Sequence, residues 1–257
     1  MVEGTSLLRK HTGLSLYRGF ESLALRQLFG DIMDTSKPHE LKDQYYKNTP
    51  FPHIVIDNFW EKKMLETVEN EIKNFKNWDG EKNFSGSKKK FFCGDHNKLP
   101  ETTKNFINFL NSKNFLSYLE QLTGNNGLIP DPYLFGGGIH NIKKGGFLKI
   151  HTDFNWHPKL NIHRVLNVLI YLNTKWQDSW KGNLILKNPN STIIKEIEPI
   201  FNRMVIFRTD DESFHGHPEP LNCPDTISRK SIALYYYSST RSDQGIINSN
   251  RTNTNYE

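Results

Sequence analysis

The second half of the chain alternates between short apolar runs and turn-forming residues. Each run is rich in Val, Ile, Tyr or Phe and is bounded by Gly, Pro, Asn or Asp. Short β-branched and aromatic runs at regular intervals are typical of the strands of a β-sandwich or β-barrel. The predicted strands cover residues 138–142, 147–150, 164–173, 183–187, 192–197, 203–208 and 231–238.

The first half shows helical spacing instead. Residues 51–59 read as a strand that leads into a helix over about 60–78, and two shorter helical patterns follow at 101–111 and 114–122. The first helix has apolar residues three, four and seven positions apart, which form one stripe suited to packing on a sheet. That stripe consists of Met64, Leu65, Val68, Ile72 and Phe75. Residues 80–94 are predicted to be a loop.

Helices followed by strands predict a mainly β, α+β protein in which a helical layer supports the β-core. We expect one domain over 49–240, with a core at about 130–238. Residues 1–48 form an N-terminal extension of uncertain structure, in which 6–28 have loosely helical spacing. Residues 241–257 form a polar C-terminal tail, which we expect to be ordered only if other residues tether it.

Composition narrows the function classes. The chain has 257 residues, a net charge of +5 and a pI near 9.0, which fits a lysine-rich solvated surface. Its one dense basic run, 88–90, is too short to predict a nucleic-acid partner. Two distant cysteines, Cys93 and Cys223, predict no disulfide framework and fit a reducing compartment. With no signal peptide and no membrane-spanning run, we expect a soluble, cytoplasmic protein without a membrane partner. The oligomeric state is not predicted.

The strongest chemical signal is the pair His151 and Asp153. Residues two apart on a strand point to the same face, so both side chains can reach one metal ion. A second histidine from another strand would complete the two-histidine, one-carboxylate face of non-haem Fe(II) oxygenases. His215 and His217 share one strand face, so the spacing alone leaves both open as that ligand. Arg229 follows as a rigid, permanently charged group for a carboxylate.

These motifs resemble the 2-oxoglutarate- and Fe(II)-dependent dioxygenases, and within them the prolyl-4-hydroxylase-like branch. The resemblance covers about 130–238 and rests on H-T-D at 151–153, I-Y-L-N at 170–173, I-E-P-I-F-N-R at 197–203, S-F-H at 213–215 and S-R-K-S at 228–231. It implies a double-stranded β-helix, or jelly-roll, core. It also implies that His151, Asp153 and His215 bind Fe²⁺.

The resemblance assigns the cosubstrate residues as well. Arg229 would bind the C5 carboxylate of 2-oxoglutarate, and Tyr171 stands where the family has a carboxylate-binding tyrosine. Asn167 and Leu169 share the strand face of Tyr171 and are expected to line the cosubstrate site. Asn141 replaces a tyrosine that the family often carries at this point. Two other arginines, Arg203 and Arg208, are interpreted as surface residues.

The implied reaction is hydroxylation of an unactivated C–H bond with O₂, while 2-oxoglutarate is decarboxylated to succinate; ascorbate is a candidate reductant. Asp153 favours hydroxylation, because halogenating relatives leave the carboxylate position empty. The expected substrate is a prolyl residue of a peptide or protein. A free amino acid or other small molecule is the alternative, and a cupin-type metal-binding jelly roll of other function is the second.

Substrate recognition is expected on the loop that directly follows the metal carboxylate. Trp156 offers a flat apolar surface there, and His157 and Arg164 offer hydrogen-bond donors. His217 is expected to face the substrate if His215 binds the metal. The alternative interpretation is that this loop is structural, with recognition on residues 79–98.

Overall fold

The computed structural model describes residues 38–241 and 245–257, so the helical pattern predicted at 6–28 lies outside the described residues. Within them, one bent sheet contains the strands, and every pairing is antiparallel, with the central order β1-β9-β6-β11-β5-β10-β7-β8. The strands are β1 (His53–Asp57), β2 (Gly80–Phe84), β3 (Ser87–Cys93), β4 (Ile129–Pro130), β5 (Gly138–Thr152), β6 (His163–Tyr171), β7 (Leu184–Lys187), β8 (Ile194–Ile197), β9 (Arg203–Arg208), β10 (Phe214–His217), β11 (Ser228–Ser238) and β12 (Asn255–Tyr256).

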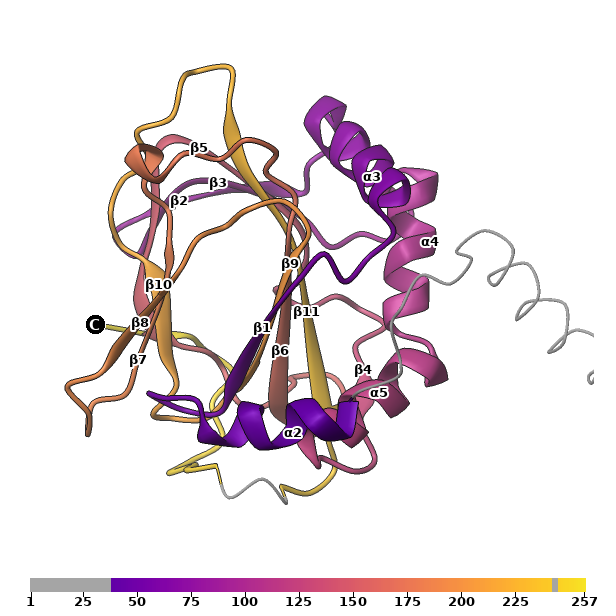
Figure 1. Ribbon diagram of the computed structural model, residues 1–257, viewed down its shortest axis with the longest axis vertical. Helices are drawn as coiled ribbons and strands as arrows, with labels where there is room; N and C mark the ends of the chain where they lie inside the picture. The colour runs from indigo at the N-terminus through magenta and orange to yellow at the C-terminus, as the bar shows by residue number, and fades with distance from the viewer. Residues whose placement is uncertain (1–37, 242–244) are drawn as a thin grey trace, which may run out of the picture.

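The predicted mainly β architecture with flanking helices is confirmed. In Figure 1 the strands curve around a central space, with β7, β8 and β10 on one side and β1, β6, β9 and β11 on the other. This is the half-barrel of a double-stranded β-helix. The two runs predicted at 138–142 and 147–150 form one long strand, β5, which pairs with β11, β3, β10 and β12.

The prediction of a loop at 80–94 is wrong, because β2 and β3 form a hairpin there. The hairpin turns at Ser85-Gly86, and β3 pairs with β5 from Ser87↔Leu148 to Cys93↔Ile139. Its sequence is charged and has no apolar alternation, so local propensity gives little sign of a strand. Pairing with the edge of β5 decides the conformation instead.

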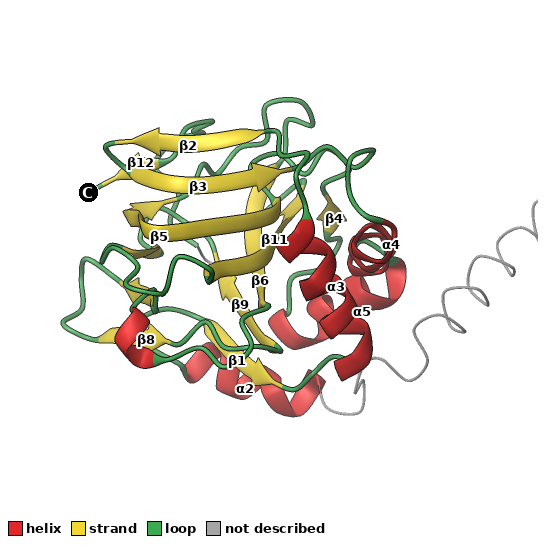
Figure 2. Ribbon diagram, turned by 90° about the horizontal axis from the view of Figure 1, so that it is seen from above, coloured by secondary structure: helices red, strands yellow, loops and turns green. Residues whose placement is uncertain are grey.

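Four α-helices of the described chain cover one side of the sheet, drawn red in Figure 2. They are α2 (Pro38–Lys47), α3 (Lys62–Asn74), α4 (Glu101–Leu110) and α5 (Lys113–Thr123), and a short 3₁₀ helix η1 (Asp178–Trp180) follows β6. The first predicted helix is shorter than expected at both ends. The Glu61 side chain caps its first turn by accepting from the Lys63 and Met64 amides, and Phe75 is already extended.

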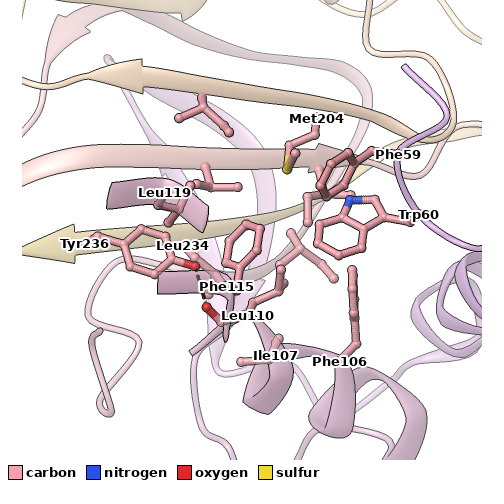
Figure 3. Close-up of a cluster of buried hydrophobic side chains, with 14 of the residues drawn as sticks. Phe59, Trp60, Phe106, Ile107, Leu110, Phe115, Leu119, Met204, Leu234 and Tyr236 are labelled. Atoms are coloured by element: carbon pink, nitrogen blue, oxygen red, sulfur yellow. Dashed lines mark hydrogen bonds between the residues drawn. The ribbon is translucent and has the colours of Figure 1, made fainter. Parts of the chain in front are cut away.

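The main core lies between these helices and the sheet (Figure 3). Trp60 packs edge-on against Phe106 and at an angle against Phe115, while Leu234 and Met204 face them from β11 and β9. Four of the five predicted stripe residues of α3 are buried, and Phe75 is partly buried against the core. Helix α2, which precedes the predicted domain start at 49, also contributes the buried Tyr45.

The polar C-terminal tail has tethers of the kind that its prediction required. Arg251 donates to Asp211 Oδ1 at 2.7 Å, and its backbone amide donates to Asn155 Oδ1 at 2.7 Å. Strand β12 then pairs with the end of β5, where Tyr256 lies opposite His151. The end of the chain is thereby held beside the residues predicted to bind metal.

Candidate metal and cosubstrate site

The structure brings His151, Asp153 and His215 together at the end of β5. Strands β5 and β10 are antiparallel neighbours with His151 directly opposite His215, and Asp153 is two residues further along. Asp153 Oδ1 lies 3.5 Å from His151 Nε2, and Asp153 Oδ2 lies 3.2 Å from His215 Nε2. The three potential ligand atoms are all within 4.8 Å of one another, and no other such cluster occurs in residues 38–241 and 245–257.

Backbone carbonyls fix the orientation of both histidines. Nδ1 of His151 lies 2.8 Å from the Lys149 carbonyl oxygen, and Nδ1 of His215 lies 3.0 Å from that of Ser213. Each Nδ1 therefore carries the proton and donates it, which leaves the Nε2 lone pair directed at the shared point. Burial and the neighbouring His215 lower the pKa of His151, so its ring is neutral, as a metal ligand must be.

The carboxylate of Asp153 is held ionised by its neighbours. Burial alone would raise its pKa, but the Arg164 guanidinium and the histidines outweigh burial and hold the pKa well below its usual range. Arg164 donates to Asp153 Oδ2 at 2.7 Å and Asn167 Nδ2 donates to the same oxygen at 2.8 Å. A charged carboxylate and two neutral imidazoles on one face are the donor set that fits Fe(II).

Arg164 has a structural consequence that can be measured. It is fully buried, bonded to Asp153 and Asn167, and stacked between the Phe154 and Tyr235 rings. Arg164→Met should therefore destabilise the metal-free protein by about 3–5 kcal/mol, because it leaves a buried carboxylate without its cation. Denaturant unfolding measures this.

The matched control for Arg164→Met is Arg203→Met. Arg203 pairs with Asp57 at 2.7 Å, but Asp57 is 43% exposed, so the loss should be about 1 kcal/mol or less. Equal losses in the two variants would contradict the role assigned to Arg164.

Arg229 lies in the same cavity with no acidic partner. Its Nε donates to the Gly182 carbonyl at 2.8 Å and its Nη2 donates to the Tyr171 hydroxyl at 3.2 Å. Only 5% of Arg229 is exposed, and no carboxylate of the described residues pairs with it. A buried guanidinium without a counter-ion fits a carboxylate supplied by a ligand. The cavity thus suits 2-oxoglutarate, which has one carboxylate for Arg229 and another for the metal.

The rival arginines do not reach this cavity. Arg203 is bound to Asp57, and Arg208 lies 2.9 Å from Asp210. Both were interpreted as surface residues, and the structure shows them partly buried and engaged in ion pairs. Neither lines the cavity of Arg229.

Three of the other four predicted cosubstrate residues line the cavity, and one does not. Leu169 and Tyr171 lie along it, and Asn167 lies at the metal carboxylate. Asn141 is buried but points away, because side chains alternate along β5 and its neighbours His140 and Ile142 line the cavity. The prediction for Asn141 is corrected: His140 faces the site in this part of β5.

Of the four predicted substrate residues, the structure places only His217 in the cavity. His157 is fully buried and lies 3.3 Å from Asp131, while the Trp156 ring packs edge-on against His163. Arg164 donates to Asp153 but does not itself line the cavity. In the loop after Asp153, Phe154 lines the cavity, whereas Trp156, His157 and Arg164 support the site without lining it.

Sequence reasoning offered residues 79–98 only as an alternative place of recognition, and it named no single residue there or in the tail. Lys82 and Lys90 enter the cavity from the β2–β3 hairpin, and Thr254 and Tyr256 enter from the tail. The Tyr256 ring lies 5.3 Å from that of His151 and 5.5 Å from that of Phe84. The basic run at 88–90 drew attention to Lys90, but a run of three lysines is typical of a solvated surface and does not predict a lysine inside a cavity. Only the pairing of the hairpin with β5 turns Lys90 inward.

Lys90 should make stability depend on pH. Burial, followed by nearby charges such as Lys82, lowers its pKa from 10.5 to about 7. Between these two values the unfolded chain keeps the proton that the folded protein lacks, so the free energy of unfolding should rise with pH across this window. Lys90→Met should flatten the rise and stabilise the metal-free protein below pH 7.

Denaturant unfolding at several pH values across the window tests this for Lys90. Lys88→Met is the matched control, since Lys88 is exposed on the same strand. An identical pH slope in wild type and Lys90→Met would show that Lys90 is not the source.

The fold and the site together define a metal-dependent oxygenase of the double-stranded β-helix class. Residues 137–237 match the profile of the 2OG-Fe(II) oxygenase superfamily. The matched stretch contains the three candidate metal ligands and Arg229, and it indicates a 2-oxoglutarate-dependent dioxygenase that uses Fe(II). A comparison with curated proteins gives no match.

Solved structures with this fold have low sequence identity to the chain. A prolyl hydroxylase from Trichoplax adhaerens, in complex with a hypoxia inducible factor peptide, aligns with TM-score 0.56 and 19% identity over 85% of this chain and 92% of that one. A Pseudomonas putida prolyl-4-hydroxylase aligns with TM-score 0.50 and 14% identity over 78% and 98%. HygX from Streptomyces hygroscopicus, with nickel, 2-oxoglutarate and hygromycin B bound, aligns with TM-score 0.55 and 11% identity over 82% and 96%.

The described helices include none with the length and apolar character needed to cross a membrane. Cys93 and Cys223 are both free and buried, in agreement with the expectation of no disulfide framework.

Proposed function

We propose that this chain hydroxylates an unactivated C–H bond of an organic substrate, with His151, Asp153 and His215 binding Fe(II) and Arg229 binding 2-oxoglutarate. The observation that carries the proposal is the uncompensated, buried Arg229 cation in the same cavity as the three ligands. When bound, Fe(II) and 2-oxoglutarate activate O₂ for the oxidation, with release of succinate and CO₂. The protein supplies ligand geometry, charge and exclusion of water.

The chain's own residues have separate tasks in this proposal. Arg164 and Asn167 hold the Asp153 carboxylate in one rotamer and keep it ionised. The Tyr171 hydroxyl orients Arg229, whose Nε is fixed by the Gly182 carbonyl. Tyr256 and Thr254 of the tail form part of the cavity wall, which limits the water that reaches the reacting carbon.

A second cavity gives the substrate a route to the metal. It shares Lys82, His140 and Phe154 with the metal cavity and continues along an aromatic wall. That wall includes Phe92, Tyr133 and Phe135. An aromatic wall suits the ring of a prolyl residue, and the likeness to peptide-hydroxylating enzymes supports a peptide or protein substrate.

A small-molecule substrate is the second candidate. The tail forms part of the wall of both cavities, with Thr254 lining both and Tyr256 packed against the hairpin residue Phe84. A wall that includes the tail favours a free amino acid or similar molecule over a folded partner. HygX, which has the same fold, is described with hygromycin B bound.

The reaction is tested by adding Fe(II), 2-oxoglutarate and ascorbate to the purified chain and measuring succinate. We expect slow succinate release without substrate and faster release with the right one, screened among prolyl peptides and free amino acids. Anaerobic crystals with Mn(II) and 2-oxoglutarate should show which residues bind each. No succinate from metal-loaded protein with any substrate of the screen would favour the cupin-type alternative.

A further inference from the structure

Two lysines face each other across the β2–β3 hairpin and point into the metal cavity. Lys82 is directly opposite Lys90 in the hairpin register, so both side chains lie on one face of the sheet. Like charges in directly opposite positions destabilise a strand pair. Lys90 is also 93% buried, since only 7% of it is exposed. Keeping both amines charged is unfavourable unless an anion lies near them.

The described residues do not provide that anion. Neither lysine has an ion pair with an acidic side chain, and Asp79, at the start of the hairpin, is already paired with Lys98 at 2.7 Å. Asp153 is the one carboxylate in the wall of the metal cavity, and it is bound by Arg164, Asn167 and the histidines. Among the described residues, neither lysine therefore has an acidic side chain as an ion-pair partner.

His217 is an independent sign of a missing polar ligand. It is 3% exposed, it lines the metal cavity, and neither ring nitrogen has a hydrogen-bond partner. A buried polar group without a hydrogen-bond partner costs about 1–3 kcal/mol. A ligand with polar oxygens would remove this cost by bonding to the His217 ring.

In the proposed function, the cosubstrate does not supply an anion for these lysines. The two carboxylates of 2-oxoglutarate have partners in the metal and in Arg229, and Lys82 and Lys90 are left over. On the basis of the proposed function, we propose that these two lysines bind an anionic group of the substrate, a carboxylate or a phosphate. The hydroxylated molecule would then be a small acid, with its anionic group beside the metal.

The second cavity shows where the rest of this acid would lie. Lys82 belongs to the walls of both cavities, at their junction, and the aromatic wall of Phe92, Tyr133 and Phe135 begins there. A molecule with an anionic end and an apolar or ring-shaped body would fit, because its anionic end would lie at the lysines and its body along the aromatic wall. A free amino acid has such a carboxylate, whereas a prolyl residue inside a peptide chain does not.

The test uses the full chain loaded with Mn(II) and saturating 2-oxoglutarate under nitrogen. Mn(II) is paramagnetic, so it speeds the NMR relaxation of any probe that binds close to it. The probes are inorganic phosphate, followed by its ³¹P signal, and ¹³C-labelled acetate. Saturable relaxation enhancement gives the dissociation constant of each probe, and the tighter probe identifies the anion class.

We expect wild-type protein to bind at least one probe. Lys82→Met and Lys90→Met should each weaken that binding at least about ten-fold, because a charge-assisted contact is lost. Lys88→Met, which removes an exposed lysine from the same strand, should bind the probe as wild type does. The dissociation constant of 2-oxoglutarate, measured with the same Mn(II) signal, should change much less than that of the probe.

Three results would overturn the proposal. They are no probe binding by wild type, equal binding by wild type and both variants, and a larger loss of 2-oxoglutarate affinity than of probe affinity. The last would assign the lysines to the cosubstrate. Failure of the proposed function is distinct, because the wild-type chain would then not bind 2-oxoglutarate or form succinate from it, whatever the probes do.

Discussion

Asp153→Ala is expected to abolish both Fe(II) binding and succinate formation. The change removes the one anionic ligand and leaves two imidazoles beside the buried cation Arg164. That cation would repel a divalent ion that has lost its counter-charge. Mn(II) binding followed by electron paramagnetic resonance, together with succinate formation, measures the effect. We expect no stoichiometric metal at concentrations that saturate wild type.

Two histidine variants make this prediction specific to the assigned ligands. His215→Ala should lose the metal, because His215 Nε2 is one of the three clustered atoms. His217→Ala should keep it, since His217 is not in that cluster although it lines the same cavity. Metal binding that survives in His215→Ala but not in His217→Ala would reverse the assignment of the distal ligand.

The sequence was sufficient for the parts of the fold that depend on local pattern. Strands β6, β9 and β11 have dense β-branched and aromatic residues, and helix α3 has a complete apolar stripe. The H-T-D motif at 151–153 could also be predicted from local pattern, because side chains alternate along a strand and this puts His151 and Asp153 on one face. Such features need no knowledge of the neighbouring strands.

Residues whose direction depends on a partner strand could not be predicted in this way. The direction of Lys90 is set by its pairing with Ile142 on β5, 52 positions away in the chain. The β5 strand also has an irregular register with β3 near Lys88 and Lys90, so counting residues back from His151 selected Asn141 where His140 lines the cavity. Register is a tertiary property, and one step reverses the face of a side chain.

The loop after Asp153 shows a second limit of motif reasoning. Proximity in sequence to a metal ligand suggested that Trp156 and His157 contact substrate. His157 instead accepts from the Lys159 and Leu160 amides through Nδ1 and lies against Asp131 through Nε2. A buried histidine with both nitrogens satisfied shapes a loop. The sequence does not distinguish it from a histidine that faces a ligand.

Arg229→Ala is expected to raise the apparent KM for 2-oxoglutarate by at least about thirty-fold. Truncating one partner of a buried charge pair costs about 2–5 kcal/mol, and each 1.4 kcal/mol is a factor of about ten in affinity. The loss should be large because Arg229 is buried and its Nε and Nη2 are already placed by Gly182 and Tyr171. Titration of 2-oxoglutarate against succinate formation, and against Mn(II)-loaded protein, measures it.

Conservative variants separate the charge of Arg229 from its geometry. Arg229→Lys should recover only part of the affinity, because a lysine keeps the charge but cannot make two parallel contacts to one carboxylate. Tyr171→Phe should have a smaller effect than Arg229→Ala, since it removes one hydroxyl at 3.2 Å from the guanidinium. If Arg229→Ala keeps wild-type affinity while Lys90→Met loses it, the cosubstrate carboxylate is bound by Lys90. Arg203 and Arg208 would still not be candidates, because Asp57 and Asp210 already neutralise them.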